Sequence, residues 1–297
     1  MSAAIIFVLL TVLMLTGMPV SISLGLTVLT FLFMFTEVPL ESVALKLFTG
    51  IEKFEIMAIP FFVLAGNFLT HGGVARRMID FATAMVGHLR GGLGMSSVFA
   101  CALFAAVSGS SPATVVAIGS IMIPAMMKVG YPKPFGAGVV ASAGGLGVLI
   151  PPSIVMVMYA VSTNSSIGAL FMAGVIPGLL CALMLGFTTW WVARKGDYPR
   201  EPKRSFADVW VAFRRAIWGL ALIIVVMGGI YSGMFTPTEA AAMSAMYAFF
   251  IAIFVYKDLK LSDVPKVLLN SANMSAMLLY IITNAVLFSF ILTNEQI

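Results

Sequence analysis

Residues 102–125 read ALFAAVSGSSPATVVAIGSIMIPA, and they lie inside the run 91–127, which contains no charged side chain. Small hydroxyl residues and a glycine occupy the middle of this run, at 107–114, between apolar flanks. Each flank has about 15 residues, too few to cross a hydrocarbon core of about 30 Å singly. The stretch therefore predicts a re-entrant helical hairpin whose tip lies within a membrane.

The composition of the whole chain supports a membrane location. Hydrophobic residues make up 61% of the 297 residues and charged residues only 10%, whereas soluble globular domains carry roughly 25% charged residues. Two more runs, 134–193 and 267–294, also lack charge, and each exceeds the ~20 residues of one spanning helix. We therefore predict an all-α polytopic membrane protein. The apolar N-terminus lacks a basic flank and a cleavage site, which predicts a retained helix.

The basic residues are arranged as orientation signals. Lys and Arg number 17 against 12 Asp and Glu, but they lie in short loops between apolar runs, which argues against a nucleic-acid surface and places these loops in the cytoplasm. The segment 194–215 is the best candidate for a cytoplasmic linker. It contains seven basic residues: Arg194, Lys195, Arg200, Lys203, Arg204, Arg214 and Arg215.

A second interruption follows at 144–153, GGLGVLIPPS, inside the uncharged run 134–193. Pro151 and Pro152 lack backbone donors and disfavour helix directly before them, so this segment should unwind within the bilayer. Two alternatives remain at this level: a proline kink without function here, and close packing of small residues at 107–114.

Two unwound segments predict a pair of binding sites. Irregular backbone at membrane depth must be buried in protein or line a cavity, and its freed carbonyls need a partner. A sodium ion is a natural partner because it is a hard cation that prefers oxygen. The N-termini of the half-helices in turn attract carboxylates. We expect a cation site beside an anion site.

Two other breaks suggest an internal repeat. Gly17–Pro19 divides the first apolar run as a hairpin or a kink, and 232–239 divides a later one, where Thr236, Pro237 and Glu239 fit a capping box. We expect a first repeat at 1–195, with membrane helices in 1–70, the hairpin and broken helix in 91–165 and a further membrane helix in 166–193. After the linker, 216–297 would begin a second repeat. Two equal repeats predict about 430 residues, so we expect the sequence to be C-terminally truncated.

Five segments carry a resemblance to a known family. They closely resemble the large membrane (permease) subunit of TRAP transporters, the DctM-like family of the ion-transporter superfamily, and the match covers essentially the whole chain. The segments are FFVLAGNFLTHGGVARRMIDFA (61–82), GHLRGGLGMSSV (87–98), FAAVSGSSPATVVAIGSIMIPAM (104–126), YPKPFGAGVVASAGGLGVLIPPS (131–153) and GMFTPTEAAA (233–242).

The resemblance implies an inverted-repeat, elevator-type secondary transporter in a bacterial inner membrane, with scaffold helices in 1–70 and a transport domain that contains the hairpin and broken helix in 91–165. It implies sodium-coupled import of organic acids, such as C4-dicarboxylates, sialic acid or related carboxylates, with Na⁺ as coupling ion and no other cofactor. The implied partners are a small four-helix membrane subunit and a periplasmic substrate-binding protein.

The resemblance also assigns site residues. Those implied for sodium, mainly through backbone carbonyls, are Ser108, Ser111, Gly147, Ile150 and Pro152. Those implied for the substrate are Ser110, Pro112, Thr114, Pro151 and Ser153. The family's second hairpin and second proline break do not occur in this sequence, so we expect this chain to be inactive by itself.

Two other functions compete. A stand-alone divalent-anion symporter or exchanger of the same superfamily would need no binding protein. An intramembrane hydrolase is suggested only by a serine beside glycine in a membrane turn. Such enzymes need a well-placed histidine or paired intramembrane aspartates, and Asp80 is the only aspartate before Asp197. We therefore expect a transporter without catalytic residues.

Overall fold

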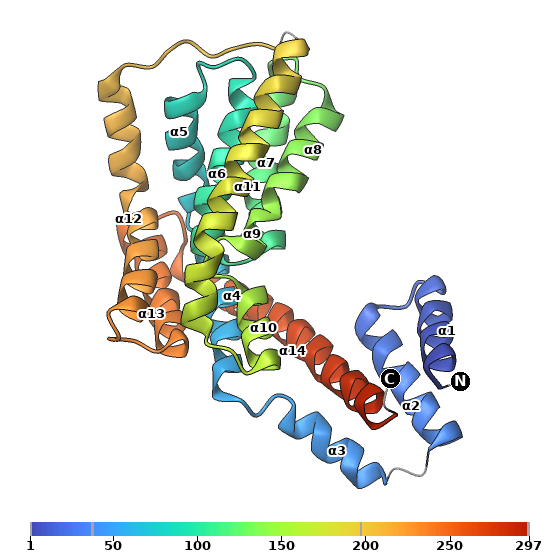
Figure 1. The fold of residues 1–297 in the computed structure, drawn as a ribbon. Coiled ribbons are helices and arrows are strands. Elements are labelled where there is room, and N and C mark those ends of the chain that lie inside the picture. Colours follow the sequence, from blue (N-terminus) through green and yellow to red (C-terminus); the bar gives the residue numbers. More distant parts are fainter. Residues whose placement is uncertain (1, 37–38, 197, 296–297) are drawn as a thin grey trace. The chain divides into compact units, whose positions relative to one another are not determined.

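A computed structural model describes residues 2–36, 39–196 and 198–295, and within these ranges the chain forms helices and no strand (Figure 1). The chain divides into two compact units. The smaller unit comprises residues 1–56 with 273–297, and the larger unit comprises residues 57–272. This architecture confirms the all-α prediction.

The smaller unit contains α1 (Ser2–Leu15), α2 (Val20–Phe35), α3 (Leu40–Thr49) and the later part of α14 (Val264–Asn294). Gly17 separates α1 from α2 with a left-handed φ of +82°, a conformation that glycine adopts without steric cost. The first apolar run is therefore a helical hairpin, and not a kinked helix. Its core consists of Ile6, Val28, Phe31, Leu32, Val43, Leu287 and Ile291.

The larger unit carries both segments that the sequence singles out. Its α-helices are α4 (Ala58–His71), α5 (Val74–Val86), α6 (Gly92–Ser108), α7 (Ser111–Lys128), α8 (Lys133–Gly144), α9 (Leu146–Leu149), α10 (Ile154–Thr163), α11 (Ile167–Lys195), α12 (Phe206–Tyr231) and α13 (Pro237–Phe250). A 3₁₀ turn, η1 (Phe54–Met57), precedes α4. The π-helix η2 (Ile251–Val255) and the 3₁₀ turn η3 (Leu261–Asp263) follow α13.

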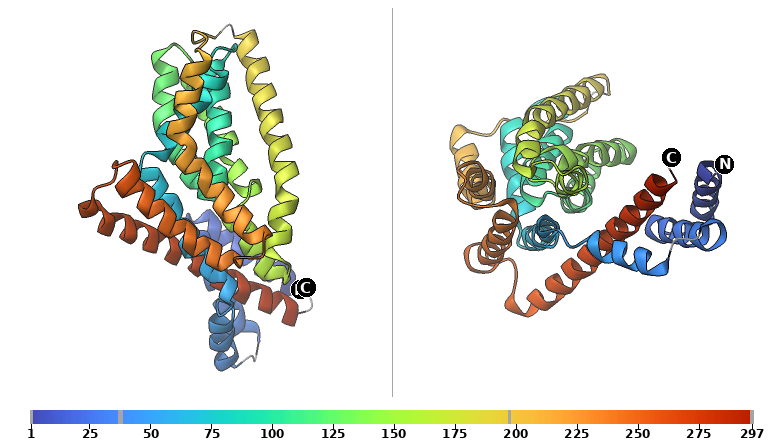
Figure 2. Two further views of the ribbon diagram at one scale, coloured as in Figure 1. Left: turned by 90° about the vertical axis from the view of Figure 1, so that its left-hand side faces the viewer. Right: turned by 60° about the horizontal axis from the view of Figure 1, so that its bottom comes forward.

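Helix α6 lies at the centre of the larger unit. It packs against α4, α5, α7, α8, α9, α11 and α12, which surround it in both views of Figure 2. Small residues on α6 permit this close approach, because Ala100, Cys101 and Ala105 are fully buried against their neighbours. The hairpin that begins with α6 is therefore held on many sides.

Six helices of the described chain are long and apolar enough to cross a membrane. A seventh crossing is possible through a bent pair, Lys133–Leu149 with Ile154–Thr163. The six are Phe54–His71, Ser111–Lys128, Ile167–Lys195, Phe206–Tyr231, Pro237–Val255 and Leu261–Asn294. These spans agree with a polytopic membrane protein.

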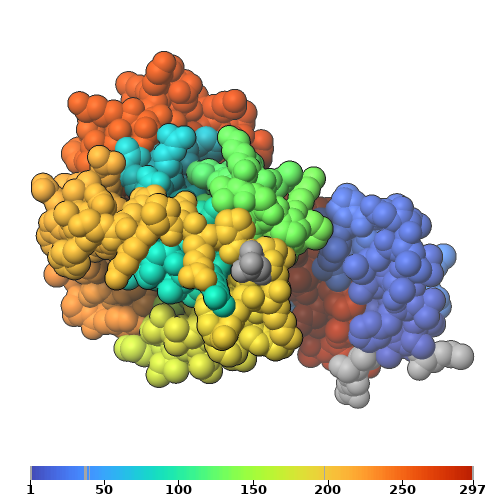
Figure 3. Space-filling model, turned by 90° about the horizontal axis from the view of Figure 1, so that it is seen from above, coloured from blue at the N-terminus to red at the C-terminus, as the bar shows by residue number. Residues whose placement is uncertain are grey.

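The basic segment 194–215 is only partly a loop. Its two ends belong to α11 and α12, so among the described residues only 196 and 198–205 lie outside the helices. This loop, gold in Figure 3, runs over the ends of neighbouring helices. The Tyr131 hydroxyl donates to Pro199 O at 2.8 Å, and the Glu201 N–H donates to Gly87 O at 3.2 Å. Burial raises the pKa of Tyr131, which keeps its hydroxyl protonated as a donor.

The turn between α12 and α13 ends in a capping box. The Thr236 N–H donates to Glu239 Oε2 at 2.8 Å, and the Glu239 N–H donates to Thr236 Oγ1 at 3.3 Å. Pro237 is the first residue of α13, where a missing N–H costs nothing. These three residues fix the start of a membrane helix and have a structural role.

Candidate functional site

The turn between α6 and α7 is short and tight. Gly109 adopts a left-handed φ of +62°, and its N–H donates to Ala105 O at 2.9 Å. A glycine in this conformation directly after a helix satisfies one of the helix's last carbonyls. One extended residue, Ser110, then leads into α7. The predicted helical hairpin is therefore present, with its turn at Gly109–Ser110.

Ser110 caps α7. Its backbone is extended, with φ −131°, and its Oγ accepts the Ala113 N–H at 3.4 Å. In the sequence, Ser111 followed by Pro112 predicts Ser111 as the cap, because proline favours the first turn of a helix; this prediction is wrong by one residue. Only the last non-helical residue can aim its hydroxyl at the free N–H groups of the first turn, and Ser111 is already helical.

The cap assignment predicts different stabilities for two neighbouring variants. Ser110→Ala should lower the free energy of unfolding by about 1 kcal/mol, because one N–H of α7 loses its acceptor. Ser111→Ala should lower it by less, because the half-buried Ser111 already lies inside α7 and is not its cap. Thermal unfolding of the purified variants measures both changes. A larger loss for Ser111→Ala than for Ser110→Ala would contradict the assignment.

The buried hydroxyls of the turn bind one another. Ser108 and Thr114 are fully buried, and their hydroxyl oxygens lie 3.1 Å apart. Thr114 donates its single hydroxyl proton to Ser110 O at 2.8 Å, so Ser108 must be the donor to Thr114. This network holds the end of α6 and the start of α7 in one arrangement.

The second predicted break is narrower than the sequence suggested. Gly144 and Gly145 stay helical, with φ −59° and ψ −20° at Gly145, and the chain leaves the helix only at residues 150–153. The two helical parts on either side are bent by 41°. The prolines cause this break, because each lacks an N–H and clashes with a preceding turn.

The break and the hairpin turn contact each other through their backbones. The Ile154 N–H, at the start of α10, donates to Gly109 O at 3.0 Å. A Cβ atom added to Gly147 would lie 2.8 Å from Ser111 N. A Cβ atom added to Gly109 would lie 2.7 Å from Pro152 O. We call this meeting of residues 108–114 with 147–154 the hairpin–break junction.

Three further glycines let neighbouring helices reach the junction. An added Cβ atom would lie 3.3 Å from Ser108 O at Gly66 of α4, 2.6 Å from Leu149 O at Gly174 of α11, and 2.9 Å from the Ile150 side chain at Gly178. None of the three was predicted as a site residue. The spacing of Gly174 and Gly178 is the small-xxx-small signal of close helix packing, which could have identified them.

The junction lies part-way along the helices that pass beside it. Gly178, which contacts Ile150, is about 17 Å from the start of α11 and about 26 Å from its end. Gly66, which contacts Ser108, is about 12 Å from the start of α4 and about 8 Å from its end. The turn and the break therefore lie well inside the length of both helices, as a re-entrant hairpin requires.

Helix ends with partial charges of both signs converge at the junction. The C-terminal ends of α6 and α9 bring free carbonyls with partial negative charge, and the N-terminal ends of α7 and α10 bring partial positive charge. Ser153 is fully buried there, and its Oγ has no hydrogen-bond partner among the described residues. Because buried polar groups in proteins are hydrogen-bonded, this hydroxyl is free to bind an ion, a water molecule or a ligand.

The structure brings seven of the ten predicted site residues together at the junction. The Ile150 side chain packs on α11, so only its backbone faces the junction, and Pro112 is exposed in the first turn of α7. The residues that meet at the junction are Ser108, Ser110, Ser111, Thr114, Gly147, Pro152 and Ser153. Pro151 is buried in the break itself.

Known proteins share this sequence over nearly its whole length. Residues 7–297 match the family model described as "Tripartite ATP-independent periplasmic transporter, DctM component". The C4-dicarboxylate TRAP transporter large permease protein DctM of Rhodobacter capsulatus is 71% identical over 100% of this chain and 71% of its own length. The protein of the same name from Pseudomonas aeruginosa is 55% identical over 93% of this chain and 64% of its own length.

Relatives that are named for other substrates also match. The sialic acid TRAP transporter large permease protein SiaM of Vibrio cholerae is 36% identical over 96% of this chain and 67% of its own length. All these relatives are transporter permeases and not enzymes, which excludes the hydrolase hypothesis. With its apolar helices and this match, the multi-pass membrane protein described here belongs to the DctM family of tripartite ATP-independent periplasmic transporters.

Proposed function

We propose that this chain is the large membrane component of a sodium-coupled importer of C4-dicarboxylates in the bacterial inner membrane. The 71% and 55% identical relatives carry that substrate in their names. The proposed partners are a small four-helix membrane subunit and a periplasmic substrate-binding protein. The single observation that carries the proposal is the hairpin–break junction, where helix ends of opposite partial charge surround the fully buried Ser153 hydroxyl, which has no hydrogen-bond partner among the described residues.

The oxygen donors at the junction suit a sodium ion. The runs 91–127 and 134–193 that form it contain no charged residue, so its donors are carbonyls and hydroxyls. Within the described ranges, no three side chains of His, Cys, Asp or Glu gather to hold a metal. Neutral oxygens alone bind a monovalent hard cation in preference to a transition metal. We assign the sodium site to Ser108, Ser111, Gly147, Ile150 and Pro152, mainly through backbone oxygens.

The two helix N-termini at the junction suit a carboxylate. Each helix N-terminus stabilises an anion by about 0.3–1 kcal/mol, and by up to about 2 kcal/mol in a partly buried setting. Ser110 and Ser153 precede α7 and α10 directly, so their hydroxyls flank the place where a carboxylate would bind. We assign this subsite to Ser110, Pro112, Thr114, Pro151 and Ser153.

Coupling follows from the shared backbone of the two subsites. Segment 150–153 ends the α8–α9 helix on the cation side and begins α10 on the anion side. A cation that orders this segment therefore also fixes the N-terminus of α10, and the two bound charges attract each other. Each ligand then raises the affinity for the other by the same factor. In an elevator mechanism the hairpin and the broken helix, 91–165, would move together past the scaffold.

Uptake into proteoliposomes tests the proposal. The whole transporter, reconstituted with its small membrane subunit and supplied with its binding protein, should accumulate labelled succinate only under an inward sodium gradient. Replacing sodium with potassium should stop uptake. Uptake that persists in potassium would contradict the coupling. Uptake that persists without the binding protein would instead favour a stand-alone symporter or exchanger.

A substitution near the cation subsite should change the sodium dependence. Ser111→Ala should raise the sodium concentration for half-maximal uptake about 3- to 10-fold, the loss of about 1 kcal/mol expected for one oxygen contact. Ser120→Ala is the matched control, because Ser120 lies on the exposed face of the same helix and donates only to Ala117 O, at 3.2 Å. Unchanged sodium activation in Ser111→Ala would remove that residue from the site.

A further inference from the structure

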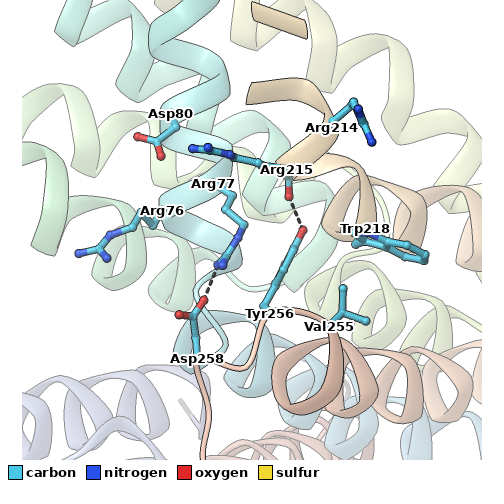
Figure 4. A pocket seen from close by; sticks show the side chains of 9 residues that line it. All are labelled: Arg76, Arg77, Asp80, Arg214, Arg215, Trp218, Val255, Tyr256 and Asp258. Carbon is cyan, nitrogen blue, oxygen red and sulfur yellow. Dashed lines mark hydrogen bonds and ion pairs between the residues drawn. The ribbon is translucent and has the colours of Figure 1, made fainter. Parts of the chain in front are cut away.

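A cavity lies in the larger unit, away from the hairpin–break junction. Its volume is about 450 Å³, and it opens between α5, α12 and the segment that follows α13 (Figure 4). Four arginines line it: Arg76 and Arg77 from α5, and Arg214 and Arg215 from α12. This concentration of guanidinium groups is unusual for a protein in which only 10% of the residues are charged.

One wall of the cavity is fixed by Arg77. Its guanidinium forms an ion pair with Asp258, donates to Gly73 O at 2.9 Å and stacks on the Tyr256 ring, with Cζ 3.8 Å from the ring centroid. The Tyr256 hydroxyl donates to Arg215 O at 2.7 Å. Burial raises the pKa of Tyr256 to about 12, so the hydroxyl remains a donor at physiological pH. These contacts tie α5, α12 and residues 256–258 together.

The other three arginines retain free charge. The side chains of Arg76, Arg214 and Arg215 form no ion pair and no hydrogen bond within the described part of the chain. Figure 4 shows Arg215 reaching across the cavity in the direction of α5, where Asp80 is the remaining carboxylate. Three unpaired cations against one carboxylate make the cavity a site of positive potential that favours a multiply charged oxyanion.

The cavity lies where two membrane helices change from apolar to charged. The apolar part of α12 begins at Ala216, directly after Arg215, and continues for about 24 Å to Tyr231. The apolar span Pro237–Val255 is about 28 Å long and ends directly before Tyr256. Both lengths approach the ~30 Å hydrocarbon core, as expected if the arginines lie at the level of the lipid headgroups.

Apolar and aromatic side chains continue from this level towards the membrane interior. Trp218 lines the cavity and is 48% exposed, as is typical of tryptophans in the headgroup region. Phe250 and Phe254 lie at the end of the adjoining span, with tilted rings whose centroids are 5.2 Å apart, and both are 55% exposed. A ligand with a charged head and apolar chains would match both the cavity and this surface.

We propose that the cavity binds the phosphate of an anionic phospholipid, with Arg215, which reaches across it, as the main ligand and Arg76 and Arg214 adding positive charge at its two edges (Figure 4). Guanidinium groups bind phosphate oxygens in pairs, and basic pockets between membrane helices are known to accept anionic headgroups. Free phosphate shares the headgroup's chemistry but would gain nothing from the exposed aromatic surface. The bound lipid would thereby add contacts between α12 and α5 to those that the protein makes by itself.

Thermal unfolding of the detergent-purified transporter, with its small membrane subunit, tests this site. Phosphatidylglycerol should raise the unfolding temperature by about 5 °C more than phosphatidylcholine does. The double variant Arg214→Gln/Arg215→Gln should lose most of this difference. The matched control is Arg200→Gln/Lys203→Gln, which removes the same charge from the exposed loop 196–205 and should keep it.

Lipid retention and the contradicting outcomes can also be defined. Native mass spectrometry should find about one fewer retained phosphatidylglycerol on the double variant. If that variant does not fold, the exposed Arg76→Gln replaces it. Equal stabilisation of the native protein by both lipids would overturn the proposal. An equal rise in unfolding temperature with inorganic phosphate alone would overturn it in favour of a free anion. A double variant that loses the small subunit but retains all its lipid would overturn it in favour of a protein partner.

Discussion

Gly147→Ala should reduce sodium-dependent uptake at least about 100-fold, the size of effect expected when a ligand site is misplaced by about 1 Å. The new methyl group would lie 2.8 Å from Ser111 N and 2.9 Å from Ser110 C, which are backbone atoms of the hairpin turn. Backbone cannot rotate away as a flexible side chain can, so the turn and the break must separate. Initial rates of labelled-succinate uptake in proteoliposomes measure the effect.

A second glycine of the same helical segment provides the control. Gly138 lies in α8, and a Cβ atom added there would meet no other atom within 4 Å. Gly138→Ala should therefore preserve uptake and stabilise the helix by about 0.5–1 kcal/mol, because alanine loses less conformational entropy than glycine. Equal uptake by the two alanine variants would show that contact between the break and the turn is not needed for transport.

Ser153→Ala should make the protein more stable and less active at once. Its hydroxyl is fully buried without a partner among the described residues, so removing it should raise the free energy of unfolding by about 1 kcal/mol in the absence of ligands. If that hydroxyl binds sodium or the carboxylate, succinate uptake should fall at least about 10-fold, since one strong contact is worth about 1.4 kcal/mol or more.

Ser23 separates the two effects of this substitution. It lies in α2 of the smaller unit, and its hydroxyl is likewise fully buried and unpartnered within the described ranges. Ser23→Ala should give the same gain in stability and leave uptake unchanged. A loss of uptake of equal size in both variants would mean that buried serine hydroxyls affect this protein only through its fold.

The hairpin and the broken helix could be predicted because each has a strong local cause. An uncharged run too short for two crossings required a turn near Ser108–Thr114, and two adjacent prolines required an interruption at Pro151–Pro152. The details were less accurate. The cap is Ser110 and not Ser111, because one residue of backbone conformation decides it. The break begins at Ile150 and not at Gly144, because glycines permit a bend without imposing one.

Features that depend on tertiary packing could not be predicted. Gly66, Gly174 and Gly178 are close to the junction only because α4 and α11 pass beside it. The arginine cavity joins residues about 180 positions apart in the sequence, Arg77 and Asp258 among them. The unpartnered hydroxyl of Ser153 is likewise a property of its surroundings and not of its sequence position. The domain boundaries and the internal repeat remain predictions.

Sodium-dependent thermal stabilisation of the purified permease, with its partner subunit, tests the proposed site most directly. Unfolding temperatures would be measured in sodium chloride and in potassium chloride at equal ionic strength, for the native protein and for Gly147→Ala and Gly138→Ala. We predict that sodium, and not potassium, stabilises the native protein and Gly138→Ala, and that Gly147→Ala loses this stabilisation. A sodium-specific shift of native size in Gly147→Ala would place the sodium site away from the hairpin–break junction.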